Sequence, residues 1–227
     1  MADLHDSTEH YLATIFEIEE ERIEIKRARI AERLNISAPS VTEHIHRMEK
    51  QGLVSVAKNN SVSLTEEGRI KAATVVRRHR LAERLLVDVL GLDWSKAHNE
   101  ADRWEHVISD EVEKHLIKLL GNPDTCPHGN PIPNADGTRG NAEKKLDKKI
   151  APLTDSKENS QATIRRIGES IEINKQALTF VADNKLMPGE KIQVNGLTFE
   201  TVSVYTTGKN QVEIPAEIAK SIFVETN

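Results

Sequence analysis

Apolar residues recur at helical spacing three times within the first fifty residues, over residues 4–21, 27–34 and 37–52. Ser37 is placed to cap the third helix, and Pro39 lies in its first turn, where a missing backbone N–H costs nothing. Two short helices joined by a tight turn are typical of a helix-turn-helix. The first fifty residues therefore predict a helix followed by a helix-turn-helix.

The pattern then changes to alternation. Residues 53–57 and 61–64 alternate apolar and polar residues around a Lys-Asn-Asn turn at 58–60, which predicts a hairpin. A hairpin after a helix-turn-helix is the wing of a winged helix. Helical spacing then returns, and the pattern predicts three more helices over 65–90, 95–107 and 109–120, capped by Thr65, Ser95 and Ser109.

Prolines and a lysine-rich polar stretch without periodicity follow the last of these helices and predict a linker. From Thr163 onward, short β-branched runs are separated by glycines, which predicts a small β-barrel. The runs are 171–173, 191–194, 199–204 and 211–214. The fold class is therefore α+β, with predicted domains at 1–73 (winged helix), 74–135 (helical), 136–162 (linker) and 163–227 (barrel).

The composition limits the classes of function that the chain can have. The chain of 227 residues is 37% hydrophobic, and it contains neither a long apolar run nor a signal-peptide pattern. We therefore expect no membrane partner. One cysteine, Cys126, rules out an intramolecular disulfide framework and fits a cytoplasmic location. The net charge is −5, and residues 1–73 carry 10 Lys and Arg against 13 Asp and Glu, so DNA binding must come from a local basic patch.

The second helix of a helix-turn-helix enters the DNA major groove. Winged helices also serve as protein-interaction modules, so a regulator switched by a partner protein is an alternative. The residues expected near base edges are Ser37, Ala38, Pro39, Ser40, Thr42, Glu43 and Arg47, with His46 beside them. The residues expected to contact phosphates are Arg27, Arg29, Arg47, Lys50 and the wing residue Lys58.

Potential metal ligands gather in the helical region. On the predicted helix 95–107 they stand at positions i, i+4, i+7 and i+8, so one helix face carries all four. These four are His98, Asp102, Glu105 and His106. His79 and Glu83 form an i, i+4 pair on the preceding helix, and His10 could complete either set. A His and a carboxylate at this spacing also form ordinary surface ion pairs.

Several longer motifs resemble the diphtheria-toxin-repressor family of metal-dependent transcriptional regulators. They occur in the family's order over nearly the whole chain. The motifs are residues 9–12, 27–34, 79–86, 103–107 and 129–133, and those similar to the family's SH3-like domain are 166–169 and 186–190. The resemblance implies a homodimer with a winged-helix domain, an all-α dimerisation domain, a C-terminal SH3-like β-barrel and two metal sites per subunit.

The resemblance also implies the ligands. The primary site maps onto His10, Asp102, Glu105 and His106. The ancillary site maps onto His79, Glu83 and His98, with Glu169 and Glu172 from the barrel. Manganese-type relatives use a Cys-x-His pair near the same glutamate, so Cys126 and His128 are candidates to join or replace part of that set, unless Cys126 is an inert loop thiol.

The chain departs from both branches of the family. Iron-responsive members have Met and Cys at the positions of His10 and Asp102, whereas manganese-responsive members have acidic residues at both. A primary set without sulfur favours harder ions such as Mn²⁺, although Co²⁺ or Zn²⁺ can bind tightly in vitro.

We therefore expect a manganese-responsive repressor of metal-uptake genes that binds a double-stranded DNA operator. The alternatives are an iron-responsive repressor and a di-metal hydrolase. The sequence lacks His-Glu-x-x-His, a phosphate-binding glycine loop and a nucleophile elbow, so we predict neither an enzyme nor a small-molecule substrate.

Overall fold

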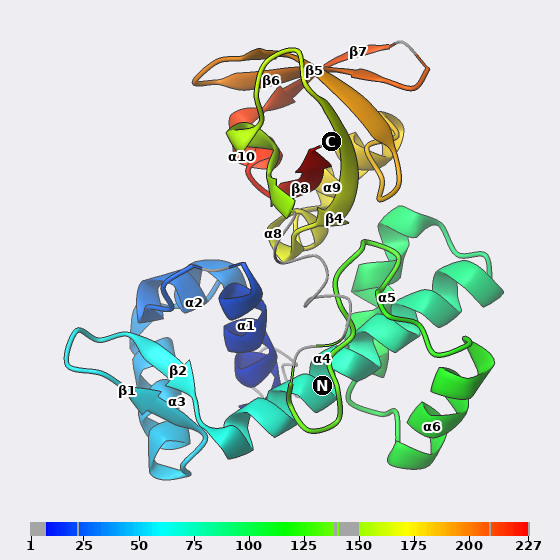
Figure 1. Cartoon of the computed structure of the whole chain (residues 1–227). Coiled ribbons are helices and arrows are strands. Elements are labelled where there is room, and N and C mark those ends of the chain that lie inside the picture. Colours follow the sequence, from blue (N-terminus) through cyan, green and yellow to red (C-terminus); the bar gives the residue numbers. More distant parts are fainter. Residues whose placement is uncertain (1–7, 22, 139, 141–149, 209, 227) are drawn as a thin grey trace. The chain divides into compact units, whose positions relative to one another are not determined.

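The computed structural model describes residues 8–21, 23–138, 140, 150–208 and 210–226. The chain divides into two compact units. Figure 1 labels the helices and strands of both. The first unit is Met1–Arg78 with Pro133–Arg139, and the second is His79–Ile132 with Gly140–Asn227. The expected start of the first helix near Leu4 and much of the expected linker lie outside the described residues. None of the described helices is long and apolar enough to cross a membrane.

The predicted winged helix is confirmed in the first unit. Its elements are α1 (Thr8–Glu20), α2 (Arg27–Leu34), α3 (Ala38–Lys50), β1 (Val54–Val56), β2 (Val62–Leu64) and the start of α4 (Glu66–Arg84). Asn35 ends α2 in the left-handed region, with φ 53°, and the Ser37 side chain accepts a hydrogen bond from the Ser40 N–H to cap α3. Strands β1 and β2 pair antiparallel as the predicted wing.

The apolar faces of α1, α2 and α3 pack with the wing and the first turns of α4 into one core. A polar ring takes part in this core: the imidazole of His44 on α3 stacks on the ring of Tyr11 on α1, with centroids 4.3 Å apart and planes inclined by 6°. His44 also hydrogen-bonds Arg47 on the same helix. The stack therefore fixes α3, the candidate recognition helix, against α1.

The middle of the chain is helical as predicted, with different helix ends. The second unit contains the rest of α4, a π-helical turn η2 (Leu85–Val89), a 3₁₀ turn η3 (Trp94–Lys96), α5 (Ala97–Trp104) and α6 (Asp110–Leu119). Ser109 caps α6 and Thr65 accepts from the Gly68 N–H at the start of α4, as predicted. The prediction that Ser95 is a cap is wrong: the Asp93 carboxylate accepts from the Ser95 N–H and caps η3.

A six-stranded antiparallel sheet forms the other part of the second unit, in the order β3-β8-β4-β5-β6-β7. Its strands are β3 (Ile150–Pro152), β4 (Gln161–Ile167), β5 (Lys191–Leu197), β6 (Thr201–Thr206), β7 (Gln211–Pro215) and β8 (Ile222–Thr226). The expected closed barrel is wrong for the described strands, because β3 and β7 are the two ends of an open order. Alternation of apolar and polar residues along a strand shows only which face of the sheet is covered. Because open and closed sheets share this alternation, the sequence could not distinguish them.

Helical turns accompany the sheet: η4 (Leu153–Asp155), α8 (Glu169–Glu172), α9 (Lys175–Asp183) and α10 (Ala216–Ala219). The predicted strand at 171–173 is therefore wrong, since its first two residues end α8. The range 136–162, expected to be a linker, contains β3, η4 and the start of β4. Side chains of the sheet and α9 form a separate apolar core.

The Tyr11–His44 stack generates a stability prediction. His44→Ala removes a buried ring from the first core and should lower the free energy of unfolding by about 2–4 kcal/mol. The matched control is His46→Ala, which removes an exposed imidazole from the same helix and should change stability by less than about 0.5 kcal/mol. Urea denaturation followed by circular dichroism measures both, and equal effects would show that the stack contributes nothing.

Candidate metal centre

The last turns of α4 bring His79 and Glu83 to one buried helix face, at the predicted i, i+4 spacing. The His79 Nε2 atom lies 3.3 Å from the Glu83 Oε1 atom. On α5, the buried His98 and the half-buried Asp102 face the same place: His79 Nδ1 is 3.3 Å from Asp102 Oδ1, and His79 Nε2 is 3.1 Å from His98 Nδ1. Helices α4 and α5 thus supply four of the predicted ligands to one cluster.

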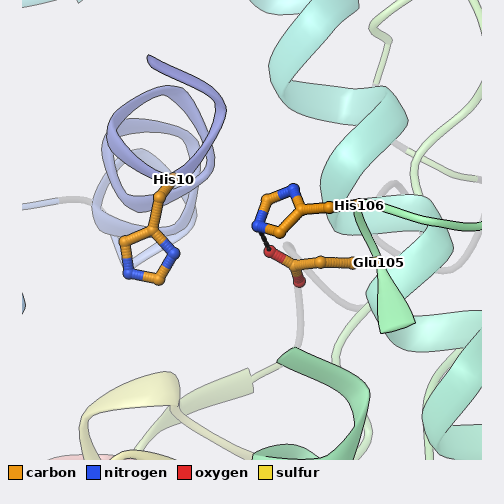
Figure 2. A group of neighbouring side chains, drawn as sticks. All are labelled: His10, Glu105 and His106. Carbon is orange, nitrogen blue, oxygen red and sulfur yellow. Dashed lines mark ion pairs between the residues drawn. The ribbon is translucent and has the colours of Figure 1, made fainter. Parts of the chain in front are cut away.

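Glu105 and His106 leave the helix on which they were predicted. Helix α5 ends at Trp104, so both residues lie on the turn that follows, and the expectation that one helix face carries all four ligands is wrong. Glu105 is nevertheless buried and its Oε2 atom is 2.8 Å from His79 Nδ1, while its Oε1 atom is 3.2 Å from His106 Nε2 (Figure 2). His10, also labelled there, projects from α1 of the first unit.

The loop between α6 and β3 brings Cys126 and His128 into the second unit, where both are buried. His128 Nδ1 lies 3.1 Å from Glu83 Oε1, and the Trp94 ring packs on the imidazole at 4.3 Å between centroids. The loop lies so close to β4 that a Cβ at Gly129, where φ is +88°, would stand 2.1 Å from the Arg165 carbonyl oxygen. Glycine is therefore required there to seat His128.

The short helix α8 supplies two more buried carboxylates at i, i+3 spacing, Glu169 and Glu172. Each uses one oxygen for a protein partner: Arg80 donates to Glu169 Oε1 at 3.0 Å, and the Asn130 amide donates to Glu172 Oε1 at 2.5 Å. The two Oε2 atoms accept no hydrogen bond from the described residues. The Oε2 atom of Glu172 lies 3.4 Å from an imidazole nitrogen of His98, and that of Glu169 lies 3.9 Å from the same atom.

These donors fit a metal centre by their chemistry. Both carboxylate oxygens of Glu83 and both ring nitrogens of His128 are buried without hydrogen-bond geometry to any described residue, although each group faces oppositely charged neighbours. Buried polar atoms left in this way cost free energy unless another partner satisfies them. Imidazole nitrogens, carboxylate oxygens and a thiol are the ligands of divalent transition ions.

The candidate DNA-contacting residues lie on α2, on α3 and its cap, and on the wing. All of them except the half-buried Arg27 are exposed. Those on α3 and at its cap are Ser37, Ala38, Pro39, Ser40, Thr42, Glu43, Arg47 and Lys50, while Lys58 is on the wing and Arg29 on α2. Arg29 pairs with Glu32 one turn along at 3.0 Å, an exposed ion pair that a phosphate can replace.

Comparison with known proteins assigns the family. Residues 3–62 match the iron dependent repressor N-terminal DNA binding domain, and residues 65–134 match the iron dependent repressor metal binding and dimerisation domain. The chain is 42% identical to the iron-dependent repressor IdeR of Mycobacterium leprae (strain TN), over 99% of both chains. The chain belongs to the iron-dependent repressor family. It also shares 40% identity with the diphtheria toxin repressor of Corynebacterium diphtheriae, over 99% of both chains.

Solved structures agree with this assignment. A manganese-dependent transcriptional repressor in complex with manganese matches with a TM-score of 0.85 and 29% identity, over 97% of this chain and 100% of that one. The predicted membership of the diphtheria-toxin-repressor family is thus confirmed. This repressor-family chain is a metal-dependent, DNA-binding transcriptional regulator, and its family comprises repressors rather than enzymes, so the hydrolase alternative is set aside.

Sequence reasoning missed the residues that support the repressor's donors. Arg80 is fully buried against Glu169, and Asn130 holds both Glu172 and the Ile167 carbonyl. Trp94 donates its indole N–H to the Pro127 carbonyl and covers His128. Arg80 and Asn130 stand inside motifs that carry the family resemblance, but a sequence shows neither their burial nor their partners.

Opposing charges shift the pKa values in this centre. Burial alone would lower the pKa of His79, His98 and His128, yet the facing carboxylates hold all three pKa values well above the ordinary range. Burial would raise the pKa of Glu83, but the His128 and His79 imidazoles hold it well below its usual value. Burial, reinforced by Glu83, raises the pKa of the Cys126 thiol to about 12.

These directions predict proton release on metal binding. The raised pKa values favour the protonated imidazoles, and an imidazole must be neutral to coordinate an ion. Mn²⁺ binding should therefore release protons, and the apparent affinity should fall as the pH falls. Calorimetry in two buffers of different ionisation enthalpy measures the number released, and His128→Gln should release fewer than wild type. Binding heats that do not depend on the buffer would contradict the prediction.

Proposed function

We propose that this repressor responds to manganese, with iron as the alternative ion, and lowers the expression of metal-uptake genes in the cytoplasm. The observation that carries the proposal is a buried set of imidazoles and carboxylates, lacking hydrogen bonds at Glu83 and His128, in a chain of a metal-dependent repressor family. Relatives that are similar in sequence are named iron-dependent, whereas the similar solved structure in complex with manganese is that of a manganese-dependent repressor. A primary ligand set without sulfur favours the harder ion.

We assign the ligands from the family resemblance. The primary ligands are His10, Asp102, Glu105 and His106. The ancillary ligands are His79, Glu83, His98, Cys126, His128, Glu169 and Glu172. Two sites per subunit follow from the family pattern. A bound divalent cation supplies positive charge and fixed bonds to these donors.

The protein's own residues transmit the signal. His10 lies on α1, next to Tyr11, whose ring packs on His44 of the recognition helix. The other primary ligands belong to the second unit. A restraint on His10 is therefore a restraint on α1, and the Tyr11–His44 stack passes it to α3. Fixing α3 in both subunits of a homodimer sets the spacing of two recognition helices, which raises affinity for an operator with two half-sites.

We also assign the domains from the family resemblance. Residues 1–73 form the DNA-binding domain, 74–135 the dimerisation domain and 163–227 an SH3-like domain, joined by 136–162. Small hydroxyl residues at the start of α3, such as Ser37, Ser40 and Thr42, allow close approach to base edges. The exposed cations Arg29, Lys50 and Lys58 are suited to phosphates, which supply affinity without sequence preference.

An anaerobic DNA-binding titration tests the proposal. The probe is a labelled duplex selected from a random-sequence library by the wild-type protein in Mn²⁺. Fluorescence anisotropy should show tight binding with Mn²⁺ or Fe²⁺ and a loss of at least about tenfold in affinity with excess EDTA, within the usual range of allosteric coupling. Equal binding in EDTA would overturn metal-dependent repression.

The same titration tests selectivity. The double variant His10→Met, Asp102→Cys exchanges an imidazole for a thioether and a carboxylate for a thiolate, so the ligand charge is unchanged while the donors become softer. The metal concentration at half-maximal DNA binding should rise for Mn²⁺ relative to Fe²⁺ and Co²⁺, with little change in affinity at saturation. A constant Mn²⁺ to Fe²⁺ ratio would place selectivity outside the primary ligands.

A further inference from the structure

The side chain of Arg47 on α3 is held by a neighbour that carries no negative charge. Arg47 is exposed, and its guanidinium hydrogen-bonds the imidazole of the buried His44, three residues earlier on the same helix. We propose that His44 is a positioning residue, which holds the Arg47 guanidinium ready for a DNA phosphate and leaves its positive charge unpaired. This inference rests on the proposed DNA-binding function and adds to it a residue that is too buried to touch DNA.

The hydrogen bond fixes the chemical state of the imidazole. A guanidinium has five N–H donors and no acceptor, so the His44 Nε2 atom must accept the bond from Arg47 Nη2. An accepting ring nitrogen carries no proton, and the ring is therefore neutral, with its proton on Nδ1. The ring is itself held by its parallel stack on Tyr11. Arg47 is thus bonded to an acceptor that is fixed in the first apolar core.

Arg47 keeps its charge because it pairs with no carboxylate in the described part of the chain. Glu43 stands four residues earlier, at a spacing suited to an ion pair, and forms none with it. Arg29 differs, since its ion pair with Glu32 must break before a phosphate replaces the carboxylate. In residues 1–73, where acidic side chains outnumber basic ones, an unpaired guanidinium contributes more to phosphate binding than a paired one.

The place of Arg47 along α3 suits a phosphate rather than a base. The first residues of a recognition helix meet base edges. Arg47 comes nine residues after Ala38, the first residue of α3, and so lies about 13 Å farther along the helix axis. Contacts to the sugar-phosphate backbone position a protein on any sequence. A guanidinium that is already held in one place also loses less conformational entropy when it binds.

Long-range proton–nitrogen NMR of the full-length protein without DNA tests the hydrogen bond. At mildly alkaline pH the His44 imidazole should carry its proton on Nδ1 and none on Nε2, since Nε2 accepts from Arg47. A proton on Nε2 would leave Arg47 without its acceptor and would overturn the proposal. This measurement does not depend on DNA binding.

A double-mutant cycle tests the DNA step, with the duplex selected by the wild-type protein and saturating Mn²⁺. His44→Phe keeps an aromatic ring beside Tyr11 but has no acceptor. It should weaken DNA binding about two- to tenfold, the loss expected when a held side chain becomes free. Arg47→Ala should weaken binding and reduce the salt dependence by about one phosphate contact. In the Arg47→Ala background, His44→Phe should have no further effect, because the side chain that it positions is absent.

Arg29→Ala is the matched control, because it removes another exposed arginine, one that pairs with Glu32 instead of His44. The losses from His44→Phe and Arg29→Ala should therefore add. Two results would overturn the positioning role: no loss of affinity in His44→Phe, or the same loss with and without Arg47. The second result would assign the effect of His44 to the packing of α3. Failure of the proposed function differs from both, since the wild-type protein would then bind DNA equally in Mn²⁺ and in EDTA.

Discussion

The burial of carboxylates opposite imidazoles is the constraint on which the second unit depends. Glu83 is 0% exposed, and transferring an unpaired carboxylate out of water costs several kcal/mol. The charged partners within reach are imidazoles such as His79 and His128, together with Arg80 at the neighbouring Glu169. The centre therefore needs positive charge, and under the proposed function metal ions replace the protons that supply it. An apolar core would have no such requirement.

The rest of the unit serves to bring these donors together. They come from α4, α5, the loop after α6 and the start of α8, which are far apart in sequence. The loop after α6 packs against β4 at Gly129, where no side chain would fit. Asn130 of the same loop donates a hydrogen bond to Glu172. The sheet thus positions the last carboxylates.

The spacing of apolar residues predicted most of the helices and strands. How these elements pack together could be seen only in the structure. The winged helix followed from the helical spacing, the Ser37 cap and the hairpin pattern, because each is encoded within a few residues. The end of α8 was mistaken for a strand at 171–173, since a run of three residues carries no distinguishing period. The predicted ligands came from spacing and family resemblance. Arg80 and Asn130 were missed because their roles depend on partners about 40 to 90 positions away.

Equilibrium unfolding of the wild-type protein in urea, with Mn²⁺ and with EDTA, tests most directly whether the buried centre is built for metal. A ligand that binds only the folded state stabilises it, by about 2.7 kcal/mol at one hundred times its dissociation constant. We predict that Mn²⁺ raises the free energy of unfolding by this order and that EDTA reverses the gain. An unchanged unfolding free energy across the titration would contradict the account and make the cluster an internal salt-bridge network.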